Sequence, residues 1–251
     1  MAKIIILGSS NAISNKDQEN THMVVVGNTR TVLIDSPNNP VLRLKNVGVE
    51  YNDITDLILT HFHPDHVSGV PLFLMDMWLR GRKKPLQIFG LDYTLERMEN
   101  LMDAFDWKNW PDFFPVTFNR LPTVGISPVL NSADFDIYAS MVHHMVPTIG
   151  LRMEFKESNK VATYSCDTEP CEEVLSLARG ADILIHEASG DVMGHSSSRQ
   201  AAEIAAEADV RHLYLIHYPT GDFWYENLLE DASSHFGGKI TLAKDLMVLE
   251  F

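Results

Sequence analysis

A run of six residues with the sequence HFHPDH constrains this chain more than any other feature. It places three imidazoles and a carboxylate, those of His61, His63, Asp65 and His66, directly after the apolar run at residues 54–60. Imidazole nitrogens and carboxylate oxygens suit zinc and its first-row neighbours. In an extended segment His61, His63 and Asp65 point to one side, and His66 can turn toward a neighbouring site. The spacing therefore predicts a site for one or two metal ions, and a chance histidine-rich loop is the weaker interpretation.

Length and charge limit the class of protein. A chain of 251 residues buries enough surface to fold without disulfides. Its only two cysteines, Cys166 and Cys171, form no disulfide framework, which favours a reducing, cytoplasmic location. The apolar run at residues 4–7 is too short for a signal peptide, and no stretch is long enough to span a membrane. The formal charge of −14 argues against broad, non-specific binding to nucleic acid.

The hydrophobic pattern predicts a mixed α/β architecture. Apolar runs at residues 3–7, 23–26 and 31–34 are separated by turn residues, which is typical of an antiparallel meander. Further along, strands alternate with helices. We expect strands at 54–59, 87–89, 116–119, 135–142, 149–155, 161–165, 183–185 and 213–216, and helices at 41–47, 67–79, 94–104, 172–178, 197–207 and 223–233. Two sheets packed face to face with helices outside would fit this order, within a single domain over residues 1–251.

Four more segments carry ligand-type residues directly after apolar runs, so their side chains should emerge at the rim of a sheet. These residues are His143 and His144, then Asp167, then His186 and Glu187, then His217. Sheet rims, where loops converge, are common places for functional sites.

Taken together, these motifs resemble the metallo-β-lactamase fold and, within it, the ribonuclease Z-like hydrolases, over nearly the whole chain. The family's HxHxDH motif is the opening hexad, and its HxVPxxG segment lies at residues 144–150. Its YSGDT turn lies at 164–168, with Cys166 in place of the usual glycine, and its HEA and GHS segments lie at 186–188 and 194–196. The resemblance implies a four-layer αββα sandwich.

The resemblance also implies a dinuclear metal site. One ion would take His61, His63 and His144, the other would take Asp65, His66 and His217, and Asp167 would bridge the two. Zinc is the expected metal, and manganese, iron or nickel also suit such ligands. A pair of ions can hold a bridging hydroxide and stabilise both ends of an in-line displacement.

Two residues are expected to be catalytic, Asp65 and His195. His195 lies outside the ligand set in a Gly-Ser-rich loop, where an imidazolium could protonate a leaving alkoxide. The alternative for His195 is a structural place near the N-cap of the next helix, with Ser196 or Ser197 as the cap. Because neighbouring strand residues face opposite ways, His143 should point away from His144.

Other residues keep two interpretations. His186 and Glu187 could orient metal ligands, or they could be a buried polar pair at a strand end. Asp35 should orient the ligand loop from behind. A cationic cluster could bind a substrate phosphate or simply end a helix in solvent; it contains Arg80, Arg82, Lys83 and Lys84.

The ribonuclease Z proteins that process transfer RNA carry a long arm between the VPxxG strand and the GDT turn. Here residues 151–163 fit only a tight hairpin. We therefore expect a phosphodiesterase acting on a small or flexible phosphodiester and not on transfer RNA, with a homodimer as a further expectation. The alternatives are a hydrolase of a lactone, thioester or sulfate ester, and a non-catalytic metal-dependent binding or sensor protein.

Overall fold

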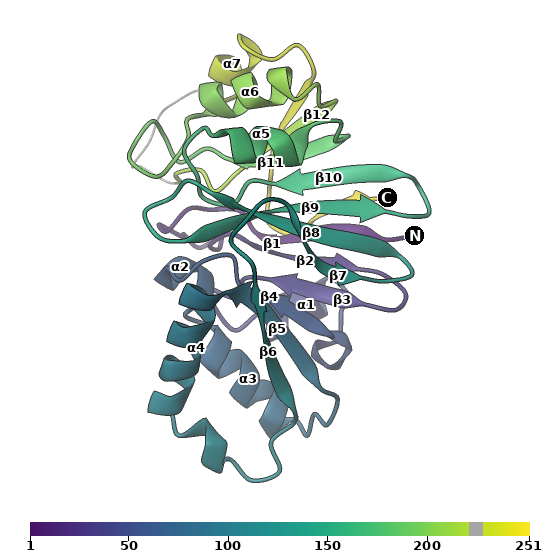
Figure 1. The fold of residues 1–251 in the computed structure, drawn as a ribbon, viewed down its shortest axis with the longest axis vertical. Helices are drawn as coiled ribbons and strands as arrows, with labels where there is room; N and C mark the ends of the chain where they lie inside the picture. Colours follow the sequence, from purple (N-terminus) through teal and green to yellow (C-terminus); the bar gives the residue numbers. More distant parts are fainter. Residues whose placement is uncertain (221–227) are drawn as a thin grey trace.

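Two seven-stranded sheets lie face to face with helices outside in the computed structural model, which describes residues 1–220 and 228–251 (Figure 1). The first sheet has the order β14-β1-β2-β3-β4-β5-β6 and the second β13-β12-β11-β10-β9-β8-β7. The first contains β1 Lys3–Gly8, β2 His22–Val26, β3 Thr31–Ile34, β4 Asp56–Ile58, β5 Leu86–Leu91, β6 Val116–Leu121 and β14 Met247–Glu250. The second contains β7 Ser127–Asn131, β8 Phe135–Val142, β9 Thr148–Phe155, β10 Lys160–Tyr164, β11 Ile183–Glu187, β12 His212–Ile216 and β13 Lys239–Leu242.

Helices form the two outer layers. The first sheet is covered by α1 Val41–Asn46, α3 Val70–Leu79 and α4 Asp92–Ala104, and the second by α5 Glu172–Ala178, α6 Ser198–Glu207 and α7 Leu228–Ser233. Short helical turns lie at α2 Pro64–Val67, η1 Tyr51–Asp53 and η2 Trp107–Asn109. Among the described residues, no helix is long and apolar enough to cross a membrane.

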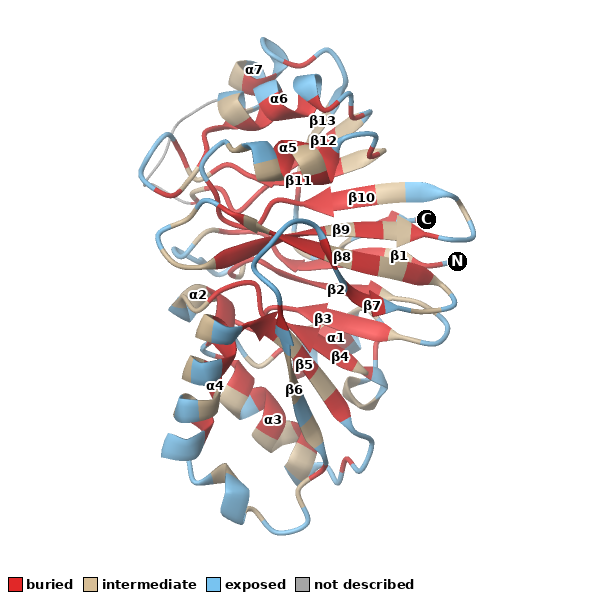
Figure 2. Ribbon diagram, viewed as in Figure 1, coloured by how far each residue is buried: buried red, intermediate tan, exposed pale blue. Residues whose placement is uncertain are grey.

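Strand alternation explains the four layers. In β1, Ile4 and Ile6 belong to the apolar cluster between the sheets, whereas Ile5 and Leu7 belong to the cluster under the helices of the first sheet. Successive side chains of a strand point to opposite faces, so a strand that is apolar at every position must be covered on both sides. Figure 2 shows the buried strands between the outer helices. The predicted four-layer αββα sandwich is confirmed.

Some predicted elements differ in the structure. The helix predicted at residues 67–79 is two helices, because the backbone N–H of Gly69 donates to the carbonyl of Ser36 and not to a helical carbonyl. A Cβ at Gly69 would lie 2.1 Å from the carbonyl oxygen of Asn38, so only glycine fits there. Pro71, which lacks an N–H, is accommodated in the first turn of α3. Strands β7, β13 and β14 were not predicted; all three lie at sheet edges and are only partly buried. Of the helix predicted at 223–233, residues 223–227 lie outside the described residues.

Parallel strand pairs bring the candidate ligands to one rim. In the first sheet β3 to β6 run parallel, and in the second β10 to β13 do. The hexad follows β4, and the other candidate residues lie at or after the carboxyl ends of β8, β10, β11 and β12. Loops at the carboxyl ends of parallel strands are a common location for binding sites.

Candidate metal centre

Three histidines converge at the rim from two different sheets. Nε2 of His61 and Nδ1 of His63 lie 3.1 Å apart, and Nε2 of His144 lies 3.0 Å from the same nitrogen of His63. His61 is fully buried, and the side chain of His144 is 0 % exposed. The residues come from the loop after β4 and the loop after β8, so the fold unites positions that are about eighty residues apart.

A second group lies beside the first. Nε2 of His217 is 3.5 Å from Oδ2 of Asp65, and Nε2 of His66 is 3.7 Å from the same oxygen. His66 belongs to the short helix α2 that begins inside the hexad, and its ring centroid lies 4.1 Å from that of His61. The hexad therefore serves both groups.

Asp167 lies between the two groups. Its Oδ2 is 3.5 Å from Nε2 of both His66 and His217, and 3.9 Å from Nε2 of both His61 and His144. The second carboxylate oxygen is buried and has no hydrogen-bond partner among residues 1–220 and 228–251, and the same holds for Nε2 of His66 and of His217. Buried polar atoms without partners are costly. A donor set of imidazoles and carboxylates with such atoms at its centre fits divalent cations.

Three histidines of the centre are oriented from outside by hydrogen bonds to the ring nitrogen that faces away from it. Nδ1 of His61 faces Oγ1 of Thr60 at 3.1 Å, Nδ1 of His144 faces the carbonyl oxygen of Gly194 at 2.6 Å, and Nδ1 of His217 faces Oγ of Ser189 at 2.8 Å. Such contacts fix the tautomer and direct the remaining nitrogen inward. Thr60 and Ser189 were not among the predicted site residues, since no spacing signal marks them.

Asp35 holds the hexad from behind, as predicted. Its Oδ2 lies 2.8 Å from Nδ1 of His66, and its two oxygens accept hydrogen bonds from the backbone N–H and the hydroxyl of Thr60. Asp35 adopts a φ of 61° immediately after β3, a conformation that aspartate and asparagine tolerate better than most residues. The turn directs a buried carboxylate at the loop that follows the neighbouring strand.

Most of the protonation states fit metal binding, because ligands must present lone pairs. Burial lowers the pKa values of His61, His63 and His144, so these imidazoles are neutral at pH 7. Burial opposes ionisation of Asp167, but the neighbouring His217 and His66 outweigh it and hold its pKa well below the usual range. The pKa of Asp65 is lowered to about 2 against the effect of burial, chiefly by its contact with His217. Burial lowers the pKa of His66, but the charges of Asp167 and Asp35 outweigh it and raise that pKa well above the usual range. Two ionised carboxylates thus face three neutral imidazoles and one imidazolium, which a metal ion would have to deprotonate.

His195 lies at the open side of the centre. Its ring centroid is 4.9 Å from that of His144 and 5.8 Å from that of His217, and its side chain remains 16 % exposed. Nδ1 of His195 contacts Oε1 of Glu187 at 2.9 Å. Burial lowers the pKa of His195, but the hydrogen bond and charge of Glu187 outweigh it, so the net pKa is raised. The arrangement suits a proton donor facing the metal ligands.

His186 and Glu187 take different roles: Glu187 organises the loops of the centre, and His186 is a buried polar residue at the strand end. Glu187 accepts backbone hydrogen bonds from Thr168, Ser189 and Ser196 besides contacting His195, so it organises the loops around the centre. His186 is fully buried, and among the described residues its hydrogen-bond partner is one backbone carbonyl, with no partner for its Nε2. The N-cap of α6 is Ser197, whose Oγ accepts from the backbone N–H of Gln200.

Two local features shape the loops. Cys166 stands where the resembling family has glycine, and its φ of 57° shows why glycine is favoured there. Gly194 has a φ of 81°, and a Cβ at this position would lie 2.9 Å from Nδ1 of His144 and 3.0 Å from Cγ of Met145. Only glycine allows the loop before His195 to approach His144 so closely.

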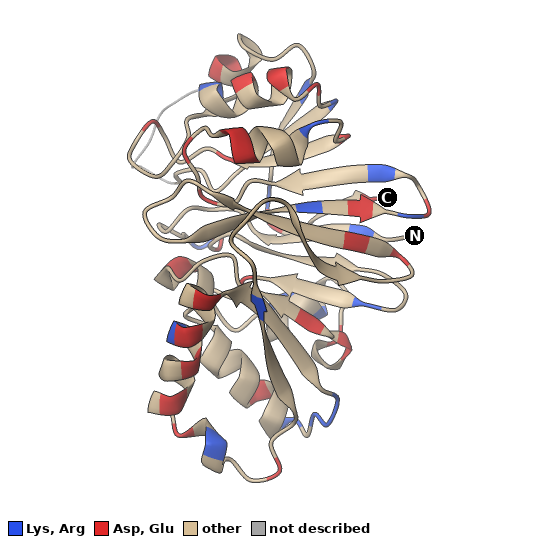
Figure 3. Cartoon of the chain, in the orientation of Figure 1, with Lys and Arg blue, Asp and Glu red and all other residues tan. Residues whose placement is uncertain are grey.

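The cationic cluster at residues 80–84 does not reach the centre. It precedes β5, whereas the hexad follows the parallel strand β4, so the two lie at opposite ends of the sheet (Figure 3). Arg82 is 2 % exposed, and its guanidinium donates to four backbone carbonyls. Lys84 pairs with Asp53 and Arg80 with Asp76. The cluster fastens the end of α3 to its surroundings.

Comparison with known proteins places this geometry in context. The chain is 26% identical over 306 aligned positions to ribonuclease Z of Methanothermobacter thermautotrophicus, covering 100% of this chain and 97% of that protein. It is 27% identical over 281 positions to ribonuclease Z of Mycobacterium marinum, covering 100% and 99%. Among solved structures, the metallo-β-lactamase fold protein YhfI from Bacillus subtilis superposes with a TM-score of 0.83 at 22% identity, covering 100% and 99%. Human tRNase Z, short form, gives 0.79 at 20% identity, covering 99% and 98%.

The predicted resemblance to ribonuclease Z-like proteins of this fold is confirmed by these relatives. A family match adds a closer assignment, because the family described as Anti-Pycsar protein Apyc1 matches residues 2–236 and so includes the hexad, His144, Asp167, His195 and His217. The chain therefore has a ribonuclease Z-like metallo-β-lactamase fold and belongs to the anti-Pycsar protein Apyc1 family.

Proposed function

We propose that this protein is a metal-dependent phosphodiesterase with a dinuclear site. The observation that carries the proposal is the position of Asp167, whose carboxylate lies between the two groups of candidate ligands. His61, His63 and His144 would hold one divalent ion, while Asp65, His66 and His217 would hold the other. Zinc is the proposed metal. Two such ions supply a water-derived nucleophile at neutral pH and stabilise charge on the attacking and leaving oxygens.

The protein's own residues would complete the reaction. Asp65 and Asp167 keep the centre anionic, which attracts cations and fixes the ligand geometry. His195 would protonate the departing oxygen, because it is the partly exposed imidazole beside the ligands and its pKa is raised by Glu187 despite burial. The relatives named ribonuclease Z support phosphodiester chemistry.

A small or flexible phosphodiester is the proposed substrate, and transfer RNA is not. Strand β9 ends at Phe155 and β10 begins at Lys160, so no arm is inserted between these two strands. The alignment with the Methanothermobacter relative has 306 positions against 251 residues here, so that relative carries segments this chain lacks. Cleavage of a precursor transfer RNA at a rate comparable with that of a small diester would contradict this part of the proposal.

The direct test is turnover of bis(p-nitrophenyl) phosphate by protein loaded with zinc or manganese. We expect p-nitrophenol release that depends on the added metal and is lost in Asp167→Ala. A metal-loaded protein without turnover would favour a binding or sensor role. Turnover confined to a panel of lactones, thioesters or sulfate esters would replace the diester proposal with one of those activities.

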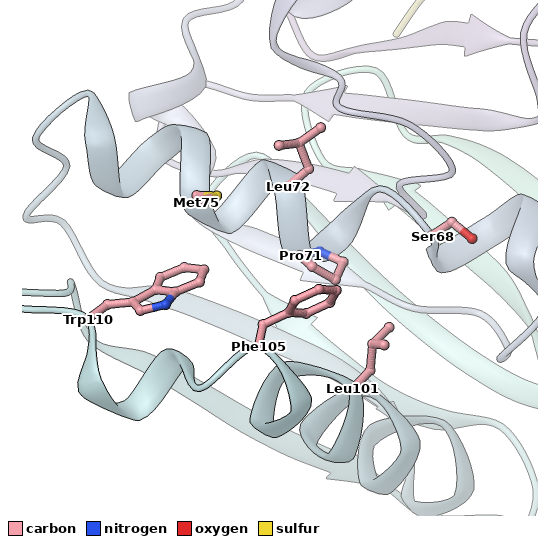
Figure 4. Close-up of a pocket in the computed structure, with 7 residues that line it drawn as sticks. All are labelled: Ser68, Pro71, Leu72, Met75, Leu101, Phe105 and Trp110. Atoms are coloured by element: carbon pink, nitrogen blue, oxygen red, sulfur yellow. The ribbon is translucent and has the colours of Figure 1, made fainter.

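We also propose that the chain forms a homodimer and acts as one domain over residues 1–251. Support comes from an apolar groove of about 460 Å³ between α3 and α4, where Leu72 and Phe105 remain 54 % and 53 % exposed (Figure 4). Apolar faces of this kind are often covered by a partner. Light scattering should give twice the 28.3 kDa chain mass, and Leu72→Asp should give a monomer. A monomeric wild type would contradict the dimer.

The cytoplasmic location stays a prediction.

A further inference from the structure

A second cluster of ligand-type side chains lies outside the candidate metal centre. It contains His143, which follows β8, together with Cys171 and Glu173 at the start of α5. One ligand atom from each residue lies within 4.8 Å of the others, and Nε2 of His143 is 3.5 Å from Oε2 of Glu173. The side chain of His143 is 63 % exposed, whereas that of His144 is 0 % exposed. His143 therefore points away from the centre, as predicted, but toward this cluster.

The chemistry of the cluster is that of a zinc site. Imidazole, thiolate and carboxylate bind zinc at about 2.0–2.3 Å, so tetrahedral coordination places ligand atoms roughly 3.4–3.6 Å apart. The His143–Glu173 separation already has this value. All three side chains are at least partly exposed, so a change of rotamer can bring the thiolate of Cys171 to the same distance. Three protein ligands leave one position for water, which is typical of an open zinc site.

The cluster spans the turn that carries Asp167. The backbone N–H of Glu169 donates to the carbonyl of His143 at 2.8 Å, and the N–H of His143 donates to Oγ1 of Thr168 at 3.1 Å. Glu169 in turn accepts from the backbone N–H of Gly194 at 2.8 Å, next to His195. A cation joining the end of β8 to the start of α5 would therefore fasten the turn from both sides.

We propose that His143, Cys171 and Glu173 form an additional divalent-metal site of zinc type that clamps this turn. The site shares no ligand with the proposed pair and does not depend on the proposed activity. Cys171 gives it a signature that the proposed pair lacks, because a thiolate bound to cobalt absorbs in the near ultraviolet.

The test is a cobalt titration of the full-length protein, reduced with a phosphine, followed by absorption and by metal analysis. We expect a thiolate-to-cobalt band in the wild type and in Cys166→Ala, and no band in Cys171→Ser. In His143→Gln, the cobalt concentration that gives half of this absorption should rise at least tenfold. Cys166 is the necessary control, because its Sγ lies 3.6 Å from Nδ1 of His61. A band that follows Cys166, or no band at all, would overturn the proposal.

A second measurement covers the case in which a variant folds poorly. In the unmodified protein, zinc in excess should slow alkylation of Cys171 by iodoacetamide at least tenfold, as measured by mass spectrometry of its peptide. Magnesium prefers oxygen ligands, so it should not slow this alkylation. Equal alkylation rates with and without zinc would also overturn the proposal.

Discussion

The two halves of the candidate centre are built in different ways. The N-terminal half comes from one hexad, in which His61, His63, Asp65 and His66 all lie after β4. The C-terminal half comes from three separate strand ends, which supply His144, Asp167 and His217. The first half is compact in sequence, whereas the second exists only when the second sheet is folded.

The difference suggests a division of roles. The hexad is held from behind by Asp35, whose hydrogen bonds to His66 and Thr60 orient metal ligands. The C-terminal half carries both the shared Asp167 and the pair of His195 and Glu187. Changes behind the hexad should therefore affect metal binding, while changes at His195 and Glu187 should affect turnover with the metal retained.

The largest effect is expected for Asp167→Ala, because this carboxylate lies between both ligand groups. Turnover should fall to background, and the metal content measured by atomic emission should fall for both ions. His63→Ala is the matched change in the hexad. It removes a ligand from one group only, so part of the metal should remain. Equal metal loss in the two variants would show that the halves do not differ in this way.

Sequence alone predicted more of the hexad half than of the other. The spacing of His61, His63, Asp65 and His66 is local, so it indicates metal chemistry without any fold. His144, Asp167 and His217 stand out as ligand-type residues after apolar runs, but their assignment to one centre came from resemblance to a family. Nothing local shows that strand ends 144, 167 and 217 meet. Their meeting depends on the packing of two sheets.

The contacts that orient the ligands were mostly beyond prediction. Asp35 was predicted, but Ser189, Thr60 and the carbonyl of Gly194 were not, because a hydroxyl or a backbone oxygen carries no spacing signal. Edge strands such as β13 were missed for a related reason: a strand with one neighbour is short and partly exposed, so its hydrophobic pattern is weak.

The next largest effect is expected for His195→Ala. Loss of a general acid costs about 10²–10⁴-fold in rate. The loss in kcat should be large for a diester with an alkoxide leaving group and small for p-nitrophenolate, which needs no proton to depart. Metal content should stay at the wild-type value. Because His195 also lies within ligand reach of His144 and Asp167, a fall in metal content would identify it as a ligand instead.

A smaller effect is expected for Glu187→Gln, and its signature is a shift in pH dependence. Against the effect of burial, the carboxylate of Glu187 raises the pKa of His195, so the imidazolium persists to higher pH. Activity that needs this proton is lost as pH rises through that pKa. Without the carboxylate, the alkaline limb of the kcat profile should move to lower pH.

Glu169→Gln is the control for that shift. Glu169 also anchors the loop through the backbone N–H of Gly194, and no contact joins it to His195 within the described residues. Its substitution should leave the alkaline limb in place. Thermal melting should show that Glu187→Gln is folded. If its alkaline limb nevertheless stays at the wild-type pH, His195 is not the general acid.

The smallest effect on kcat is expected for Asp35→Asn, on the hexad side. Asparagine tolerates the φ of 61° at this position, so the backbone turn should persist. Its amide cannot accept from both Nδ1 of His66 and the two donors of Thr60, so the imidazole is held less firmly. Loss of such a contact costs about 10–100-fold in metal affinity. With metal in excess, kcat should return close to the wild-type value.

Asp56→Asn separates this effect from general destabilisation. Asp56 is a buried carboxylate at the start of β4, at the opposite end from the hexad, and it pairs with Arg30. Its substitution should lower the melting temperature without changing the metal affinity measured by competition with a chelating dye. If Asp35→Asn lowers kcat even at saturating metal, the hexad side also contributes to the chemical step, and the division between the halves fails. If only affinity changes, the contacts behind the hexad act on metal retention and His195 acts on proton donation, and the two can be changed separately.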